Sequence, residues 1–304
     1  MIAARPAGAL TDDALRLTHS VWVQLGLSGW TSQHDDWAVD LEPLILFTAW
    51  IGGDDARLRS EALDWCVRNW RSVSKSRLRN LLGQSPPDVQ EAFAPFSATV
   101  SRHGGTSWPG ALDDLAEAAG VTGRSERPDL SRPAMAWLRL RAVFGVGARA
   151  EVLRSLLSTE ATELSVSRLA ELTSYTKRIV ADECDQLARS GVLSVRQRRT
   201  SFVYGLRRPA EVEALLGGLP PVRPNWTALW SVTRELVALE RRAAANPATV
   251  PVHARSALER LQKPLDELGL DGPPLSPLHG AQLWPALQDF GTNVMAAWAD
   301  GREP

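Results

Sequence analysis

Two short clusters of hydroxyl and cationic side chains lie close together in the middle of the chain. The first cluster consists of Ser174, Tyr175, Thr176, Lys177 and Arg178. The second cluster consists of Arg196, Arg198 and Arg199. Hydroxyl groups and cations bind phosphate oxygens, and arginine side chains also hydrogen-bond to the edges of bases. The two clusters therefore indicate a surface that binds a polyanion.

Each cluster falls where one predicted element gives way to the next. Apolar periodicity and turn residues predict three helices over Gly147–Leu157, Val166–Leu172 and Thr176–Arg189, followed by strands over Val192–Arg196 and Phe202–Leu206. The first cluster then spans a short turn and the start of the third helix. Gly191 is placed to stop that helix, because glycine adopts the left-handed conformation of a helix C-cap. The second cluster lies at the tip of a β-hairpin.

This order of elements is that of a winged helix-turn-helix. One α-helix fits the major groove of DNA, and a hairpin wing reaches the adjacent minor groove or its phosphates. The segment Arg132–Arg208 contains 14 Lys and Arg against 7 Asp and Glu, a net charge of +7, whereas the whole chain carries −1. A basic segment in an otherwise acidic chain is typical of a polyanion-binding region. We therefore expect residues 145–208 to bind double-stranded DNA.

The segment Gly147–Leu206 resembles the winged helix-turn-helix of bacterial regulators of the ArsR and MarR type. Residues 167–172 (SRLAEL) are similar to the first helix of their DNA-binding motif, and residues 185–193 (DQLARSGVL) to the end of their recognition helix. The resemblance implies that residues 174–178 face the groove and residues 196–199 belong to the wing. The metal-sensing cysteine pair of ArsR proteins is absent, since Cys184 is expected on the inward face of its helix.

Breaks in composition divide the rest of the chain. Segments rich in glycine and proline at residues 120–133 and 217–224 resemble linkers. We expect a helical N-terminal domain over residues 1–123, a winged helix-turn-helix domain over residues 134–210 and a helical C-terminal dimerisation or regulatory domain over residues 222–304. The expected fold class is mainly α, with a central winged helix-turn-helix whose β-wing has two strands.

The N-terminal domain contains a candidate degenerate helix-turn-helix over residues 56–103. Residues 73–82 (VSKSRLRNLL) are similar to residues 165–172 (SVSRLAEL), and helical patterns flank them on both sides. Lys75, Arg77 and Arg79 would then be candidate phosphate contacts. A polar, basic helix face without a DNA-binding role explains the same pattern. A further short helix is expected over Asp113–Ala119.

Other kinds of chemistry find little support. Cys66 and Cys184 form no CxxC pair, and the five histidines show no metal-ligand spacing. Nucleotide-binding and nucleophile-elbow motifs are missing, so we expect no cofactor, no metal site and no enzymatic activity. The chain also lacks an apolar run long enough to cross a membrane. We expect a cytoplasmic protein without membrane contact.

These observations lead us to expect a sequence-specific transcriptional regulator, acting as a repressor. A homodimer is expected, because one winged helix covers only a half-site and a two-fold pair matches a palindrome. Two alternatives remain open. One is an antitoxin-like autorepressor, in which a helical domain binds a partner toxin. The other is a protein-interaction scaffold that uses the winged helix to hold a protein partner and does not bind DNA.

Overall fold

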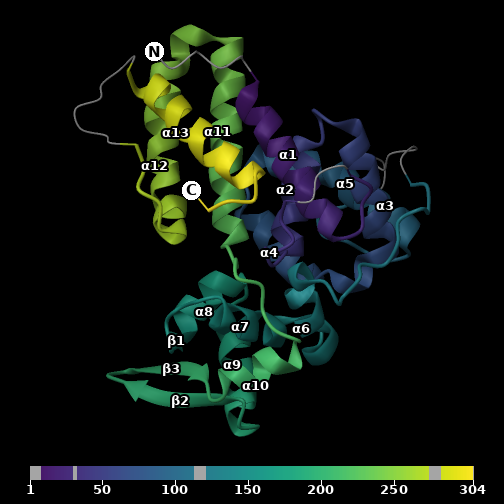
Figure 1. Ribbon diagram of the computed structural model, residues 1–304, viewed down its shortest axis with the longest axis vertical. Helices are drawn as coiled ribbons and strands as arrows, with labels where there is room; N and C mark the ends of the chain where they lie inside the picture. Colours follow the sequence, from purple (N-terminus) through teal and green to yellow (C-terminus); the bar gives the residue numbers. More distant parts are fainter. Residues whose placement is uncertain (1–7, 30–32, 113–120, 274–281, 304) are drawn as a thin grey trace. The chain divides into compact units, whose positions relative to one another are not determined.

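A computed structural model describes residues 8–29, 33–112, 121–273 and 282–303 (Figure 1). The described part is mainly helical, with a small three-stranded antiparallel sheet, so the expected mainly α class is confirmed. The helix expected over Asp113–Ala119 lies outside the described residues. None of the described helices combines the length and apolar character that a membrane crossing requires.

The chain forms two compact units, one from residues 1–23, 28–34 and 224–304, the other from residues 24–27 and 35–223. These boundaries differ from the three expected regions. The segment over residues 120–133 does not separate two units, and the first helix belongs with the C-terminal helices.

All regular elements among the described residues of the smaller unit are helices. Its elements are α1 (Ala9–Gln24, whose last residue belongs to the larger unit), α11 (Trp226–Ala245), η4 (Pro247–Thr249), α12 (Val250–Leu268) and α13 (Leu283–Ala299). Helices α11, α12 and α13 pack on one another. Glu240 of α11 caps the start of α1, because its carboxylate oxygens accept hydrogen bonds from the backbone N–H groups of Leu10 and Thr11 at 3.1 and 3.0 Å.

The larger unit begins with a helical region and continues into the sheet. The helical region contains α2 (Leu41–Ile51), α3 (Ala56–Asn69), η1 (Trp70–Ser72), α4 (Lys75–Gln84), α5 (Pro87–Gly104), η3 (Pro133–Met135) and α6 (Ala136–Phe144). Every residue of α2 is buried, and α3, α4 and α5 pack around it. Backbone hydrogen bonds join Ala38 and Asp36 to Val222, so the chain before α2 pairs with the chain that follows the sheet.

The second part of the larger unit contains the residues for which a winged helix-turn-helix was expected. Its elements are α7 (Ala148–Leu157), β1 (Leu164–Ser165), α8 (Val166–Thr173), α9 (Lys177–Arg189), β2 (Leu193–Arg198), β3 (Ser201–Leu206) and α10 (Pro209–Leu215). The sheet order is β1-β3-β2, with Leu164 opposite Tyr204 on one side of β3 and Val195 opposite Tyr204 on the other. The expected hairpin therefore gains a third strand. Two residues are too short a strand to show apolar alternation in sequence.

One buried apolar cluster holds these elements together. It includes Leu153 of α7, Leu169 of α8, Cys184 of α9 and Leu193 of β2. Cys184 faces inward, as its helical position predicts. Ser165 is the N-cap of α8, and its hydroxyl accepts a hydrogen bond from the backbone N–H of Arg168. Figure 1 shows the β2–β3 hairpin projecting beside α8 and α9.

Candidate nucleic-acid interface

The start of α9 presents hydroxyl and cationic groups to solvent. Thr176 is the N-cap, and its Oγ1 accepts a hydrogen bond from the backbone N–H of Ile179 at 3.4 Å. Lys177 and Arg178 follow, and both are exposed. Neither has an ion-pair partner among the residues that the structure describes. Two unpaired cations at the positive end of a helix dipole suit the binding of an anion.

Ser174 and Tyr175 lie in a different environment. Both are buried, with 7% of their surface exposed, and they hydrogen-bond to α4 or to its N-cap residue. The backbone of Ser174 is left-handed (φ 57°), and its carbonyl oxygen accepts a hydrogen bond from Asn80 Nδ2 at 2.8 Å. The hydroxyls of Tyr175 and Ser74 are 2.5 Å apart. These two predicted contacts are therefore turned toward the helical region, and the exposed part of the first cluster is Thr176, Lys177 and Arg178.

A buried network of charged side chains lies directly behind this turn. Its members are Asp40, Glu42, Arg77, Arg141, Glu151 and Arg154, all less than 9% exposed. Three carboxylates and three guanidinium groups balance in charge, which matters because a buried ion is costly unless it is paired and hydrogen-bonded. Glu42 accepts hydrogen bonds from Arg77 at 2.7 Å and from Arg141 at 2.6 Å. The network joins α2, α4, α6 and α7.

Two carboxylates of the network, those of Asp40 and Glu151, have lowered pKa values. Burial alone would raise the pKa of Glu151, but the positive charges of Arg77, Arg141 and Arg154 outweigh it and hold that pKa well below its usual value. The pKa of Asp40 is lowered in the same way: burial is outweighed by its guanidinium neighbours, first of all Arg77. Asp40 and Glu151 therefore remain ionised at neutral pH.

Arg77 links this network to the turn before α9. Its Nε donates to the carbonyl oxygen of Thr173 at 3.2 Å. Together with the contacts of Ser74 and Asn80, this anchors three consecutive residues, 173–175, on α4. The position of the exposed start of α9 is thus set partly by the helical region. This anchoring was not predicted from the sequence. The one feature that pointed to a buried charged network was the acidic residue Glu42 within an apolar run.

The same network leaves the candidate second helix-turn-helix with fewer phosphate contacts than expected. Helices α3, α4 and α5 do follow one another, and Ser74 caps α4 as Ser165 caps α8. Arg77, however, is fully buried in the network and cannot contact a phosphate. Of the basic residues expected to do so, Arg79 is exposed, while Lys75 is half-buried and donates to Thr106 Oγ1 at 3.3 Å.

The arginines of the second cluster also differ from one another. Arg196 forms an ion pair with Glu163 at 2.6 Å, and Arg198 approaches the same carboxylate at 3.4 Å. Arg199 lies in the two-residue turn of the hairpin with a left-handed backbone (φ 52°), is exposed, and has no ion-pair partner in the described ranges. Arg199 at the hairpin tip is therefore the most available cation of the second cluster. Glu163, which partly neutralises the other two arginines, was not recognised from the sequence.

The buried network also changes the meaning of the charge count. Arg141 and Arg154 contribute to the net charge of +7 but are neutralised in the interior. Leaving them and Glu151 out reduces the net charge of Arg132–Arg208 to +6. Most of the basic character therefore belongs to side chains outside the network.

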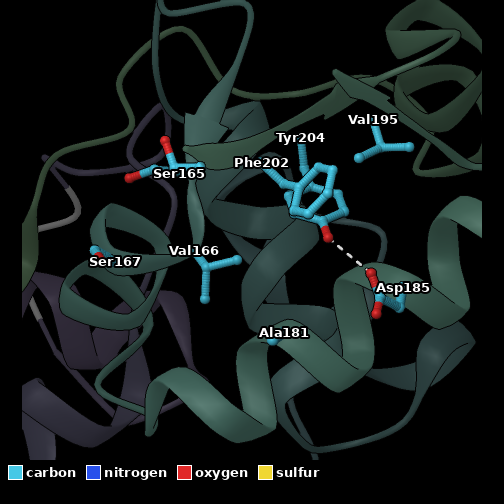
Figure 2. Close-up of a pocket in the computed structure, with 9 residues that line it drawn as sticks. Ser165, Val166, Ser167, Ala181, Asp185, Val195, Phe202 and Tyr204 are labelled. Carbon is cyan, nitrogen blue, oxygen red and sulfur yellow. Dashed lines mark hydrogen bonds between the residues drawn. The ribbon is translucent and has the colours of Figure 1, made fainter. Parts of the chain in front are cut away.

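A hollow of about 460 Å³ lies between α9 and the β2–β3 hairpin (Figure 2). It is lined by Ser165, Val166, Ser167, Ala181, Asp185, Val195, Ser201, Phe202 and Tyr204. Tyr204 donates a hydrogen bond from its hydroxyl to Asp185 Oδ1 at 2.7 Å, shown as the dashed line in Figure 2. Apolar side chains and a carboxylate make this hollow a poor place for a phosphate. Sequence reasoning did not identify it.

The cysteines and histidines do not build a reactive centre in the part of the chain that is described. Burial raises the pKa of the Cys184 thiol to about 12 and that of the Cys66 thiol well above its usual value. His34 is buried, and its ring nitrogens lie 2.7 Å from Ser20 Oγ and 2.8 Å from the carbonyl oxygen of Trp298. No group of three His, Cys, Asp or Glu side chains is arranged to hold a metal ion within the described ranges.

Comparison of this chain with protein-family models, curated proteins and solved structures found no match.

Proposed function

We propose that this protein is a sequence-specific regulator that binds double-stranded DNA through a winged helix-turn-helix. The proposal is supported by the element order α7, β1, α8, α9, β2, β3 and by the sheet order β1-β3-β2. The observation that carries the proposal is the exposed start of α9, where Thr176 caps the helix and Lys177 and Arg178 are unpaired. In this role α9 enters the major groove, and Arg199 at the hairpin tip contacts the flanking phosphates or the minor groove.

The proposed unit of binding is a homodimer acting as a repressor. A single winged helix covers one half-site, so two copies related by a two-fold axis would cover a palindrome. The helices α11, α12 and α13 are proposed to supply the dimer contacts or a regulatory contact. Analytical ultracentrifugation with and without duplex tests this proposal, since a dimer is expected at least in the DNA complex.

The function is tested by capture of the purified full chain on the DNA upstream of its own gene, followed by footprinting. Protection of a defined segment with two half-sites is expected. The Arg198→Ala/Arg199→Ala variant should lose about tenfold in affinity, because it removes two cations near the hairpin tip. Arg207→Ala/Arg208→Ala is the matched control, since it removes two exposed arginines of the same segment from the base of the hairpin. Equal loss in both variants would mean that only bulk charge matters.

One observation favours a protein-interaction scaffold as a second candidate. Val195 and Phe202 of the hairpin are half-exposed apolar side chains, and Asp182 and Asp185 add negative charge to the exposed surface of α9. Such a surface suits a protein partner better than a phosphate backbone. Failure to bind any duplex at low salt would favour this candidate. The antitoxin-like alternative adds a toxin to the DNA-binding activity, and co-purification with the product of a neighbouring gene tests it.

A further inference from the structure

The hollow between α9 and the β2–β3 hairpin has the size of a small-molecule site. Its volume of about 460 Å³ lies within the range of roughly 300–1,000 Å³ that is common for ligand pockets. Val195 and Phe202 line it, yet 50% and 54% of their surfaces remain exposed. Covering apolar side chains of this size by a ligand is favourable, because it removes apolar surface from water. The hollow therefore offers an uncovered apolar wall.

Asp185 supplies the charge on the other side of the hollow. Its carboxylate accepts one hydrogen bond, from the hydroxyl of Tyr204, and no cationic side chain lies within ion-pair distance in the described ranges. Glu163 and Glu183 nearby are different, because Glu163 is paired with Arg196 and Glu183 with Arg149. An ionised carboxylate can accept several hydrogen bonds, so Asp185 retains capacity for a further donor.

Figure 2 shows how these groups are arranged. The rings of Phe202 and Tyr204 lie over α9, and Asp185 projects from α9 toward the Tyr204 hydroxyl. Val166 and Ala181 complete the apolar lining from α8 and α9. A ligand that enters here meets aromatic and aliphatic surface together with one negative charge. A cation is attracted both to that charge and to the face of an aromatic ring.

We propose that this hollow binds a small organic cation, namely a protonated amine with an aromatic or branched apolar body. The ammonium group donates to the Asp185 carboxylate, and the apolar body packs against Phe202 and Val195. A carboxylate or phosphate ligand would be repelled by Asp185. This site goes beyond the proposed DNA binding and does not depend on it, because no residue of the exposed start of α9 lines the hollow.

The site can be tested with three probes of similar shape and different charge. Isothermal titration calorimetry or ligand-observed NMR on the full chain would compare 2-phenylethylammonium, neutral 2-phenylethanol and anionic 3-phenylpropionate. We expect saturable binding of the ammonium probe and about tenfold weaker binding of the other two, since a hydrogen bond to a charged group contributes more than a neutral one. Equal affinity of all three probes, or no saturation by the ammonium probe below about 10 mM, would overturn the proposal.

Two substitutions on α9 separate the site from general electrostatics. Asp185→Asn removes the charge but keeps an oxygen that accepts the Tyr204 hydrogen bond, so the fold should be retained. The variant should bind the ammonium probe about tenfold more weakly. Asp182→Asn is the matched control, because Asp182 is an exposed carboxylate on the same helix and does not line the hollow. The Asp182→Asn variant should bind the ammonium probe as tightly as the wild type does. An equal loss of affinity in both variants would contradict the assignment of the site to the hollow.

Phe202→Ala provides a check that does not involve charge. Since half of the Phe202 surface is exposed, its removal should change the fold little while it removes the main apolar contact. The ammonium probe should bind several-fold more weakly, because the lost apolar contact area contributes in proportion to its size. Unchanged affinity would show that the probe binds elsewhere.

Discussion

Replacement of Arg77 by methionine tests whether the buried network holds the larger unit together. Arg77 is fully buried, and its guanidinium group contacts Asp40, Glu42 and the carbonyl oxygen of Thr173. Methionine fills a similar volume without the charge. The variant therefore leaves three buried carboxylates with two guanidinium groups, Arg141 and Arg154, and leaves one carbonyl without its donor.

The expected loss is large because it comes from an uncompensated charge. Removing one partner of a buried ion pair destabilises a protein by about 3–5 kcal/mol. Arg79→Met is the matched control, since Arg79 is two residues further along the same helix and is exposed. Its effect should stay within roughly 0.5 kcal/mol. The double variant Arg77→Met/Asp40→Asn restores the charge balance, so it should lose less than the sum of the two single variants.

Urea unfolding followed by tryptophan fluorescence measures these differences in free energy. Hydrogen exchange of residues 166–189 adds a local measure, because Arg77, Ser74 and Asn80 anchor the turn that precedes α9. In the Arg77→Met variant this segment should exchange faster than in the Arg79→Met variant. A loss below about 1 kcal/mol, or equal exchange in both variants, would refute the idea that the network stabilises the larger unit and positions α9.

Further predictions concern pH, thiol reactivity and the turn before α9. The pKa values of Asp40 and Glu151 are lowered in the folded state from ordinary values of 3.8 and 4.5, so the unfolded chain binds protons more readily. The free energy of unfolding should therefore be constant near neutral pH and fall below about pH 4.5, which urea titrations from pH 3 to pH 7 would measure; a flat profile contradicts it. Cys66 and Cys184 should resist iodoacetamide at pH 8 in the folded protein and react in urea, because burial keeps the thiols protonated; mass spectrometry would detect early labelling if this is wrong. Tyr175→Phe should destabilise the fold by about 1 kcal/mol, measured by urea unfolding. It should leave the affinity for duplex unchanged once the variant is folded. A selective loss of affinity would indicate that the Tyr175 hydroxyl contacts DNA.

The helices and the β-hairpin of the central region could be predicted from sequence because their signals are local. The third helix of this region was expected over Thr176–Arg189 and is observed over Lys177–Arg189, with Thr176 as its cap. Amphipathic spacing, a capping hydroxyl and a following glycine all act within a few residues. The third strand was missed because β1 is only two residues long and is defined by its partner β3.

The environment of the candidate site could not be predicted, because it depends on residues far apart in the chain. The hydroxyl of Tyr175 is expected to be exposed until its partner Ser74, 101 positions earlier, is known. Glu42 and Arg141 are 99 positions apart, and no local pattern connects them. Buried charged groups are rare unless they are paired, so a count of arginines assigns them to the surface by default. The sequence count therefore treated Arg77, Arg141 and Arg154 as surface cations, and it did not indicate the buried network.

The measurement that tests the central claim most directly is the salt dependence of duplex binding. Fluorescence anisotropy would titrate a labelled duplex with wild-type protein and with the Lys177→Ala/Arg178→Ala variant between 50 and 200 mM salt. Loss of two phosphate contacts should reduce the slope of log affinity against log salt by roughly 1–2 and lower the affinity at each salt concentration. The Arg207→Ala/Arg208→Ala control should keep the wild-type slope. Identical slopes and affinities for the wild type and the Lys177→Ala/Arg178→Ala variant, or no duplex binding by the wild type at 50 mM salt, would contradict the proposed DNA-binding role of α9.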